Sequence, residues 1–127
     1  MGNLTNVQIG SVVLGMIEEV PSTISGAVLW NMVDNETYFA ENLTGDTISV
    51  TAIGEKYQPS IISLTAASVL RMMEMQGVDV SSLRLGDFSI GKGASSSTSS
   101  AADKLREDGI MKLESLGNEI NFYKALG

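Results

Sequence analysis

The segment 57–76 most constrains the fold of this chain, because its residues are apolar or small on nearly every side. Its central stretch, 61–73, reads IISLTAASVLRMM. A helix of this kind is usually buried on more than one side. Pro59 fits its first turn, where no amide partner is lost, and Gly77 is typical of a helix end. We therefore expect a central core helix, part of whose surface could lie between subunits of an oligomer.

Two further helices are predicted before this core helix. The first spans 4–19, where apolar residues recur near helical spacing, and Pro21 stops it. The second spans 24–43, with Ser22 or Thr23 as its cap and Gly45 just past its end. Residues 46–56 alternate apolar and polar side chains, as a strand does, but we favour a loop there.

Two less regular segments follow the core helix. Residues 78–93 contain short apolar runs broken by Gly86 and Asp87, which predicts an extended arm or irregular hairpin. Residues 94–100 are almost all serine or threonine, a composition typical of a flexible linker. The apolar side chains of the arm need cover from elsewhere in the chain or from a partner.

The chain closes with a fourth predicted helix and a tail. The helix spans 101–116, and Gly117 is expected to break it. One face should carry its packing residues, namely Leu105, Gly109, Leu113 and Leu116, while Lys112 can pair with Asp108 one turn away. The tail 119–127 is aromatic and apolar, and such a terminus should dock on its own domain or on a neighbour. The chain is thus predicted to be one all-α domain, 1–127.

Core packing is the expected role of several large side chains in the helices. Trp30 and Phe39 should pack in the core. Met72, Met73 and Met75 should act as core filler, because methionine adapts to irregular gaps. For Phe88 and the pair Phe122–Tyr123, which lie in the arm and the tail, burial against another subunit is an equal alternative.

The absence of histidine and cysteine limits the chemistry that is open to the chain. Without cysteine there are no disulfides, thiolate nucleophiles or Cys-based metal sites. Without histidine there is no ordinary catalytic triad, and the commonest metal ligand is missing. We expect no enzyme activity, no cofactor and no metal.

The charge of the chain argues against direct gripping of nucleic acid. Its net charge is −7, and its eight cations are scattered along the sequence. A nucleic-acid reader normally shows a basic face or stripe. An acidic surface repels DNA, which suits a smooth conduit better than a clamp. The apolar run from Val7 to Ile17 is too short to span a bilayer, so neither secretion nor membrane insertion is expected.

One stretch has the spacing of a phosphate-binding loop. Residues 86–93 read GDFSIGKG, with two glycines and Lys92 in place. Gly93 stands where the loop needs a hydroxyl residue for magnesium, and no buried parallel strand is predicted before it. We therefore expect these glycines to shape a loop.

The order of features along the chain resembles the head–tail connector (adaptor) proteins of tailed bacterial and archaeal viruses. The resemblance rests on the small-residue helix 64–73, the stretch LRLGDFSI at 83–90 and the helix end LESLG at 113–117. It is best over residues 57–127. Its motifs are patterns of apolar and small residues, and the serine tract and the glycines at 91–93 have no match in the family.

This resemblance implies a structural virion protein that is made in the host cytoplasm and then sits in the neck between head and tail. Family members form a ring, typically of twelve subunits, which binds the portal protein, extends the DNA channel and receives a tail-completion or stopper protein. By position, the C-terminal segment would reach toward the portal. The candidate subunit or portal interface residues are Leu83, Leu85, Phe88, Ile90, Ile120, Phe122, Tyr123 and Leu126.

Two other functions remain open from the sequence. A small helical regulator that binds a partner helix would show one exposed apolar groove and no ring. A nucleotide binder using Lys92 would be stabilised by ATP, and Lys92→Ala would lose that effect.

Overall fold

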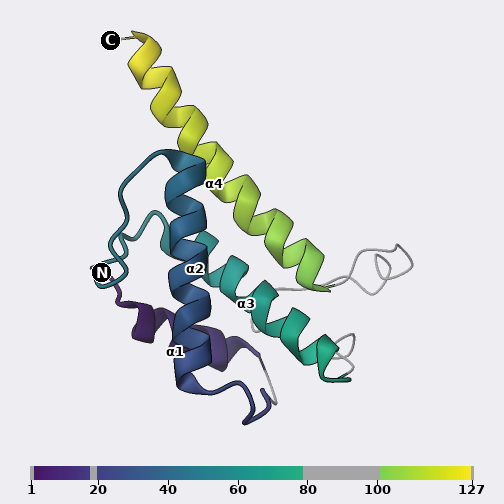
Figure 1. Ribbon diagram of the computed structural model, residues 1–127. Coiled ribbons are helices and arrows are strands. Elements are labelled where there is room, and N and C mark those ends of the chain that lie inside the picture. Colours follow the sequence, from purple (N-terminus) through teal and green to yellow (C-terminus); the bar gives the residue numbers. More distant parts are fainter. Residues whose placement is uncertain (1, 18–19, 79–100, 127) are drawn as a thin grey trace.

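The computed structural model describes residues 2–17, 20–78 and 101–126, with side chains in the last range described as far as residue 116 (Figure 1). These residues form four helices and only isolated β-bridges, so the predicted all-α bundle is confirmed. The helices are α1 (Asn6–Met16), α2 (Gly26–Thr44), α3 (Gln58–Met75) and α4 (Ala101–Leu126). The predicted arm, the serine tract and the phosphate-loop-like stretch fall almost wholly in 79–100, outside the described residues.

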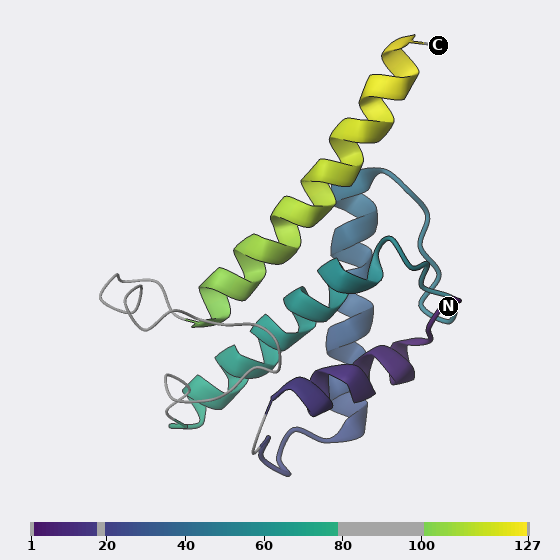
Figure 2. The same cartoon turned by 180° about the vertical axis from the view of Figure 1, so that it is seen from behind.

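Helix α3 is the centre of the bundle, as its apolar and small surface predicts. It packs against each of the other three helices, most extensively against α4, which runs antiparallel beside it (Figures 1 and 2). Ten of its residues are buried, including Ser60, Ser63 and Thr65. Small side chains let neighbouring helices approach α3 closely from several directions. The other three helices of the same chain therefore bury most of its surface.

Helix α1 begins later and ends earlier than the sequence predicts. Leu4 exchanges two backbone hydrogen bonds with Ile53, at 3.0 and 2.7 Å, which hold it in an extended conformation. Thr5 is the cap: its hydroxyl accepts from the Gln8 amide, and the Gln8 side chain accepts from the Thr5 amide. At the other end Ile17 is extended, four residues before Pro21.

The cap of α2 is Ser25, and the prediction of Ser22 or Thr23 was wrong. The Ile24 amide donates to the Pro21 carbonyl at 3.0 Å, so residues 21–24 form a turn that buries Ile24. The Ser25 hydroxyl then accepts from the Val28 amide. Because residues 21–24 form a turn, the helix begins only at Gly26, although Ser22 and Thr23 are residue types that often cap a helix.

The two glycine helix ends are confirmed. Gly45 after α2 has φ +77° and Gly77 after α3 has φ +85°, both in the left-handed region that glycine adopts without strain. Residues 46–56 contain no named strand, as the loop prediction requires. Pro59 lies in the first turn of α3, also as predicted.

Gly117 does not end α4, which continues to Leu126, so the predicted break was wrong. A glycine in a helix interior costs about 1 kcal/mol relative to alanine, which weakens a helix without terminating it. The expected packing face of α4 is confirmed: Leu105, Gly109 and Leu113 are buried and Leu116 is half-buried. In both views the C-terminal end of α4 projects beyond the other helices (Figures 1 and 2).

The expected core residues divide into buried and exposed ones. Met73 is fully buried, whereas Met75 is 87% exposed and so is not core filler. Met72 and Phe39 are partly buried against the core. Trp30 is 41% exposed and lies over Gly26 and Gly10 at the seam between α1 and α2. An indole that large covers a seam without being enclosed by it.

Candidate functional site

The outer surface of α1 is the least expected apolar feature of the described chain. Between Asn6 and Met16 the helix carries no charged residue. Its inner side buries Ile9, Gly10 and Val13, yet Val7, Val12 and Leu14 are each more than 40% exposed. A helix that is apolar nearly all round is normally buried all round.

Three residues define this surface, which we call the α1 face: Val7, Ser11 and Leu14. Val12 lies about 140° around the helix from Val7, beyond the exposed Gln8. Val7, Ser11 and Leu14 follow one another at helical spacings of four and three, so they form a continuous stripe. Gly15 borders the stripe, and a Cβ added there would meet nothing within 4 Å. The α1 face is therefore a narrow, uncharged stripe with space beside it at Gly15.

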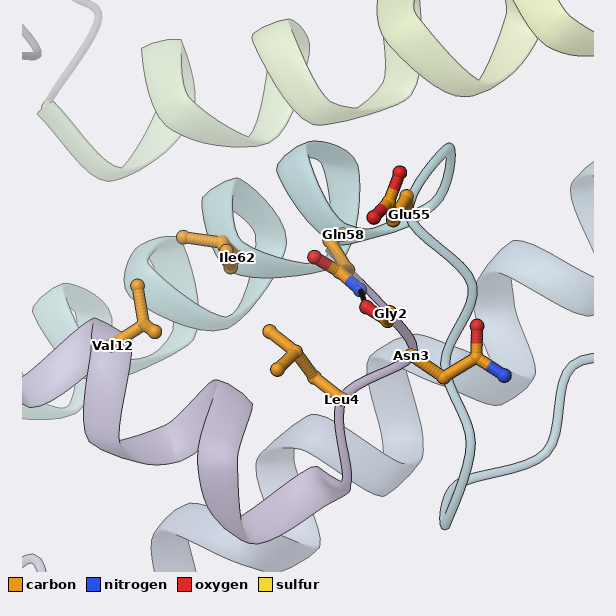
Figure 3. Close-up of a pocket in the computed structure, with 7 residues that line it drawn as sticks. All are labelled: Gly2, Asn3, Leu4, Val12, Glu55, Gln58 and Ile62. Atoms are coloured by element: carbon orange, nitrogen blue, oxygen red, sulfur yellow. Dashed lines mark hydrogen bonds between the residues drawn. The ribbon is translucent and has the colours of Figure 1, made fainter.

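A pocket lies on the Val12 side of α1, between α1, the N-terminal segment and the first turns of α3 (Figure 3). Its volume is about 720 Å³. Leu4, Val12 and Ile62 point toward one another and form its apolar wall (Figure 3). Gln58 closes one end by donating to the carbonyls of Gly2, at 3.1 Å, and Ile53, at 3.0 Å. The pocket thus offers apolar contact, the amides of Asn3 and Gln58 and a single carboxylate, Glu55.

The predicted interface residues are not brought together by the described structure. Leu83, Leu85, Phe88 and Ile90 lie outside the described residues. The remaining four are in the C-terminal end of α4, where the helix is described but the side chains are not; they are Ile120, Phe122, Tyr123 and Leu126. Their segment is part of a projecting helix as far as Leu126, and its predicted docking stays a prediction.

The α1 face was missed by sequence reasoning, although a signal was present. Eleven consecutive helical residues without a charge are unusual for a helix at the edge of a small domain. The pattern was read only as a helix with one buried side. The exposure of Val7 and Leu14 could not be seen until the other helices were in place.

A buried carboxylate joins three helices on another side of the bundle. Glu36 of α2 is only 9% exposed and accepts a hydrogen bond from the Ser68 hydroxyl of α3 at 3.1 Å. Its Oε2 atom lies 3.7 Å from the Arg106 guanidinium of α4 and has no hydrogen-bond partner among the described residues. Burial raises the pKa of Glu36, while Arg106 and the Ser68 hydrogen bond oppose that rise.

Arg106 is held above the ring of Phe39, with 4.8 Å between its guanidinium carbon and the ring centroid. The arginine therefore contacts both an aromatic face and the carboxylate of Glu36. Arg106, Phe39 and Glu36 tie α4 to α2. Their arrangement orients helices and presents no nucleophile or open cavity.

A second ionisable pair fixes the loop between α2 and α3. The Tyr57 hydroxyl donates to the Asp46 carboxylate at 2.5 Å. Burial, followed by the hydrogen bond and negative charge of Asp46, raises the pKa of Tyr57 to about 12. Tyr57 is 7% exposed, so the pair holds the loop against the bundle and is not open to a substrate.

On the outer side of α3 and α4, Asp108 accepts a hydrogen bond from Ser63 at 3.0 Å and pairs with Lys112 at 2.8 Å. The predicted pairing of Lys112 with Asp108 is confirmed. Among the residues whose side chains the structure describes, 2–17, 20–78 and 101–116, no group of three or more acidic side chains could hold a metal ion. In the same ranges no helix combines the length and apolarity that crossing a membrane requires.

Comparison with known proteins identified no protein similar to this chain. No protein-family model, no curated protein and no solved structure matches this chain. The all-α fold is therefore defined by the structure alone.

Proposed function

We propose that this chain is a non-catalytic structural subunit of a tailed-virus neck. Copies of it would form a ring of twelve subunits that joins the portal to the tail or neck and extends the DNA channel. The ring would bind the portal on one side and a tail-completion or stopper protein on the other. It would be made in the host cytoplasm and incorporated into the virion.

The α1 face is the observation that carries this proposal. Val7, Val12 and Leu14 are exposed apolar side chains on a helix without charge. Exposed apolar surface on one helix is typical of a protein–protein interaction site. A ring subunit needs such a surface, because it is in contact with a neighbour on each side.

The projecting end of α4 supports the same function. An isolated helix shorter than about 12 residues is marginal in water and gains its stability from packing. The end of α4 extends past the bundle, and its sequence contains Ile120, Phe122, Tyr123 and Leu126 (Figure 1). A neighbouring subunit or the portal would supply the packing surface.

The charge of the chain agrees with a conduit for DNA. A net charge of −7 gives each subunit an overall negative field, and a ring multiplies it. Phosphates that pass such a surface are repelled and do not stick. DNA is then cargo in transit, and no base or phosphate contact is required of any side chain.

The pocket favours a second candidate function. A small helical regulator would bind a partner through an apolar depression such as the one formed by Leu4, Val12 and Ile62. Such a protein would bind one partner helix at a defined stoichiometry and would form no ring.

Mixing the purified chain with its candidate portal protein tests the ring directly. Particle imaging should show a ring of cyclic symmetry seated on the portal, and the subunits can be counted. Phe122→Asp should reduce ring occupancy, whereas Met75→Asp should not, because Met75 is exposed at the far end of α3. A chain that never joins a portal and shows no cyclic symmetry would contradict the proposal, and one-to-one binding of a helical peptide would favour the regulator.

A further inference from the structure

We infer that the outer side of α2 docks a segment of another protein that carries lysine and arginine side chains. Four residues define this surface, which we call the α2 face: Trp30, Asp34, Tyr38 and Glu41. At about 100° per residue they fall within an arc of about 80°, so they share one side of the helix. The inference does not rest on the proposed neck function, because it concerns a different helix from the α1 face and needs no ring.

The α2 face lies on the outside of the bundle. Helix α2 crosses in front of α1 and α3 in Figure 1 and behind them in Figure 2, so one long side of it points away from the other helices. Trp30 is 41% exposed and Tyr38 is 54% exposed, while Asp34 and Glu41 are half-buried. Large aromatic side chains are enriched at protein–protein interfaces. Two of them on one exposed helix side, two turns apart, are therefore suited to a partner.

The charge of the chain is divided unevenly along the sequence. Residues 1–55 contain seven acidic residues and no lysine, arginine or histidine, whereas residues 56–127 contain eight acidic and eight basic residues. The whole net charge of −7 therefore belongs to the first 55 residues, which include α1 and α2. Helix α1 has no charged residue, so α2 and the segments on either side of it carry this charge. A surface of one sign attracts a partner of the opposite sign.

The cations of the same chain do not neutralise the α2 face. Four of the five described cations contact a partner elsewhere: Lys56 lies over the Tyr57 ring, Arg71 pairs with Asp103, Arg106 with Glu36 and Lys112 with Asp108. Within the described part of the chain, no lysine or arginine pairs with Asp34 or Glu41. Asp34 instead accepts a hydrogen bond from the Asn6 side-chain amide of α1 at 2.8 Å, which orients its carboxylate.

Glu41 occupies a position that is unfavourable for its charge. It lies in the last turn of α2, and that turn contains no basic residue. The carbonyl groups at the end of a helix carry partial negative charge, so a carboxylate is disfavoured there and a cation is favoured. A basic side chain from a partner would be attracted by the helix end and by the Glu41 carboxylate together.

Lysine and arginine side chains match both kinds of group on the α2 face. Their charge pairs with carboxylates, and the arginine guanidinium also stacks on the faces of tryptophan and tyrosine rings. The chain shows the same chemistry internally, where Arg106 lies 4.8 Å from the centroid of the Phe39 ring and 3.7 Å from Glu36. Trp30 and Tyr38 are about 12 Å apart along the helix axis, a distance that about four extended residues span.

A second copy of this chain does not fit as the occupant. A two-fold contact through the α2 face would bring two sets of acidic side chains together, because such a contact uses the same patch on both partners. Like charges placed against one another weaken an interface. Residues 56–127 have no net charge, so that part of a second copy offers the face no net attraction. The occupant is therefore a basic segment of a different protein.

Titration of the full chain with nona-arginine, a synthetic basic peptide, tests this inference. Trp30 is the only tryptophan of the chain, so its fluorescence reports contact at the α2 face directly. The peptide should bind at about 0.05 M salt, where exposed charges are weakly screened, and should change the Trp30 fluorescence. Calorimetry gives the Kd, which should rise with salt concentration.

Two matched double variants distinguish docking at the α2 face from general attraction to an acidic protein. Asp34→Asn with Glu41→Gln removes two charges from the face, and the amide oxygen at position 34 can still accept from Asn6. Glu74→Gln with Glu114→Gln removes two exposed charges from α3 and α4. The first double variant should weaken binding about fivefold, and the second less than about twofold.

Tyr38→Ala tests the aromatic part of the face without changing the charge. It should weaken binding of nona-arginine about threefold through loss of one ring face. Circular dichroism on every variant verifies that the helices are intact. The inference is overturned if the peptide does not bind, if binding leaves the Trp30 fluorescence unchanged, or if the two double variants weaken binding equally. Binding of spermine as tightly as the peptide would also overturn it, because the face would then take small polycations and not a protein segment.

Discussion

Gly109 of α4 lies against Leu64 of α3 so closely that a Cβ at position 109 would be 2.7 Å from the Leu64 Cγ atom. The same Cβ would be 3.0 Å from the Ser60 carbonyl oxygen, which is backbone and cannot swing aside. The closest approach of the two most extensively packed helices therefore depends on the missing side chain of Gly109.

Gly109→Ala should destabilise the protein, although alanine favours a helix. Alanine gains about 1 kcal/mol of helix propensity, but overpacking a core contact costs about 1–3 kcal/mol. Urea unfolding should show a net loss. Gly15→Ala is the matched control, since its Cβ would meet nothing within 4 Å, and it should stabilise by up to about 1 kcal/mol. Equal effects of the two variants would contradict the close contact.

Glu36 should make stability fall as pH rises. Its folded pKa is raised above the ordinary value of 4.5, so the folded state holds the proton more tightly than the unfolded state does. This contribution is fully present below pH 4.5 and is lost as pH rises through the folded pKa. The stability of the unaltered chain minus that of Glu36→Gln should therefore decrease across this window in urea titrations.

Glu41→Gln, a carboxylate on the same helix, serves as a comparison for Glu36. A pH-independent difference between the unaltered chain and Glu36→Gln would show that the carboxylate is solvated and not held between Ser68 and Arg106.

Tyr57 should titrate at a higher pH than an ordinary tyrosine, because its pKa is raised. Its pKa is raised to about 12 from 10.0, so its contribution to stability is present below pH 10 and is lost as pH rises toward 12. Absorbance of the phenolate should show a late step that Tyr57→Phe removes. The same variant should cost about 1 kcal/mol at neutral pH through loss of the hydrogen bond to Asp46. A late step that persists in Tyr57→Phe would assign it to another tyrosine.

Truncation of two methionines on α3, two residues apart, should change the free energy of unfolding by very different amounts. Met73 is fully buried, so Met73→Ala should cost about 2–5 kcal/mol through lost burial and a cavity. Met75 is 87% exposed, so Met75→Ala should change the free energy of unfolding by less than about 0.5 kcal/mol. Denaturant titration of both variants tests this, and a comparable cost for Met75→Ala would place it against another part of the chain.

Local features of the chain were predictable from the sequence because their causes are local. Gly45 and Gly77 end their helices through a backbone conformation that glycine adopts most easily. Pro59 fits a first turn wherever that turn packs. The small-residue pattern of α3 predicts a helix buried on several sides, because no other arrangement covers it. The all-α class follows from such signals.

The candidate site was predictable only in part. The apolar residues near the end of α4 were identified from composition, but Gly117 was assigned too strong an effect on the helix. The α1 face escaped notice, because spacing alone does not tell which sides of an apolar helix meet neighbours. Its exposure depends on α2 and α3 covering one side of α1 and nothing in the described chain covering the other.

The sequence by itself thus determined where α2 and α3 end, which helix is central and which catalytic chemistries lack their residues. Only the tertiary structure decided that Met73 is buried and Met75 exposed, that Glu36 is enclosed between Ser68 and Arg106, and that α1 shows an apolar outer face. The physical reason is the distance along the chain over which each interaction acts. Caps and turns act within a few residues, whereas burial is set by which faces of distant helices meet.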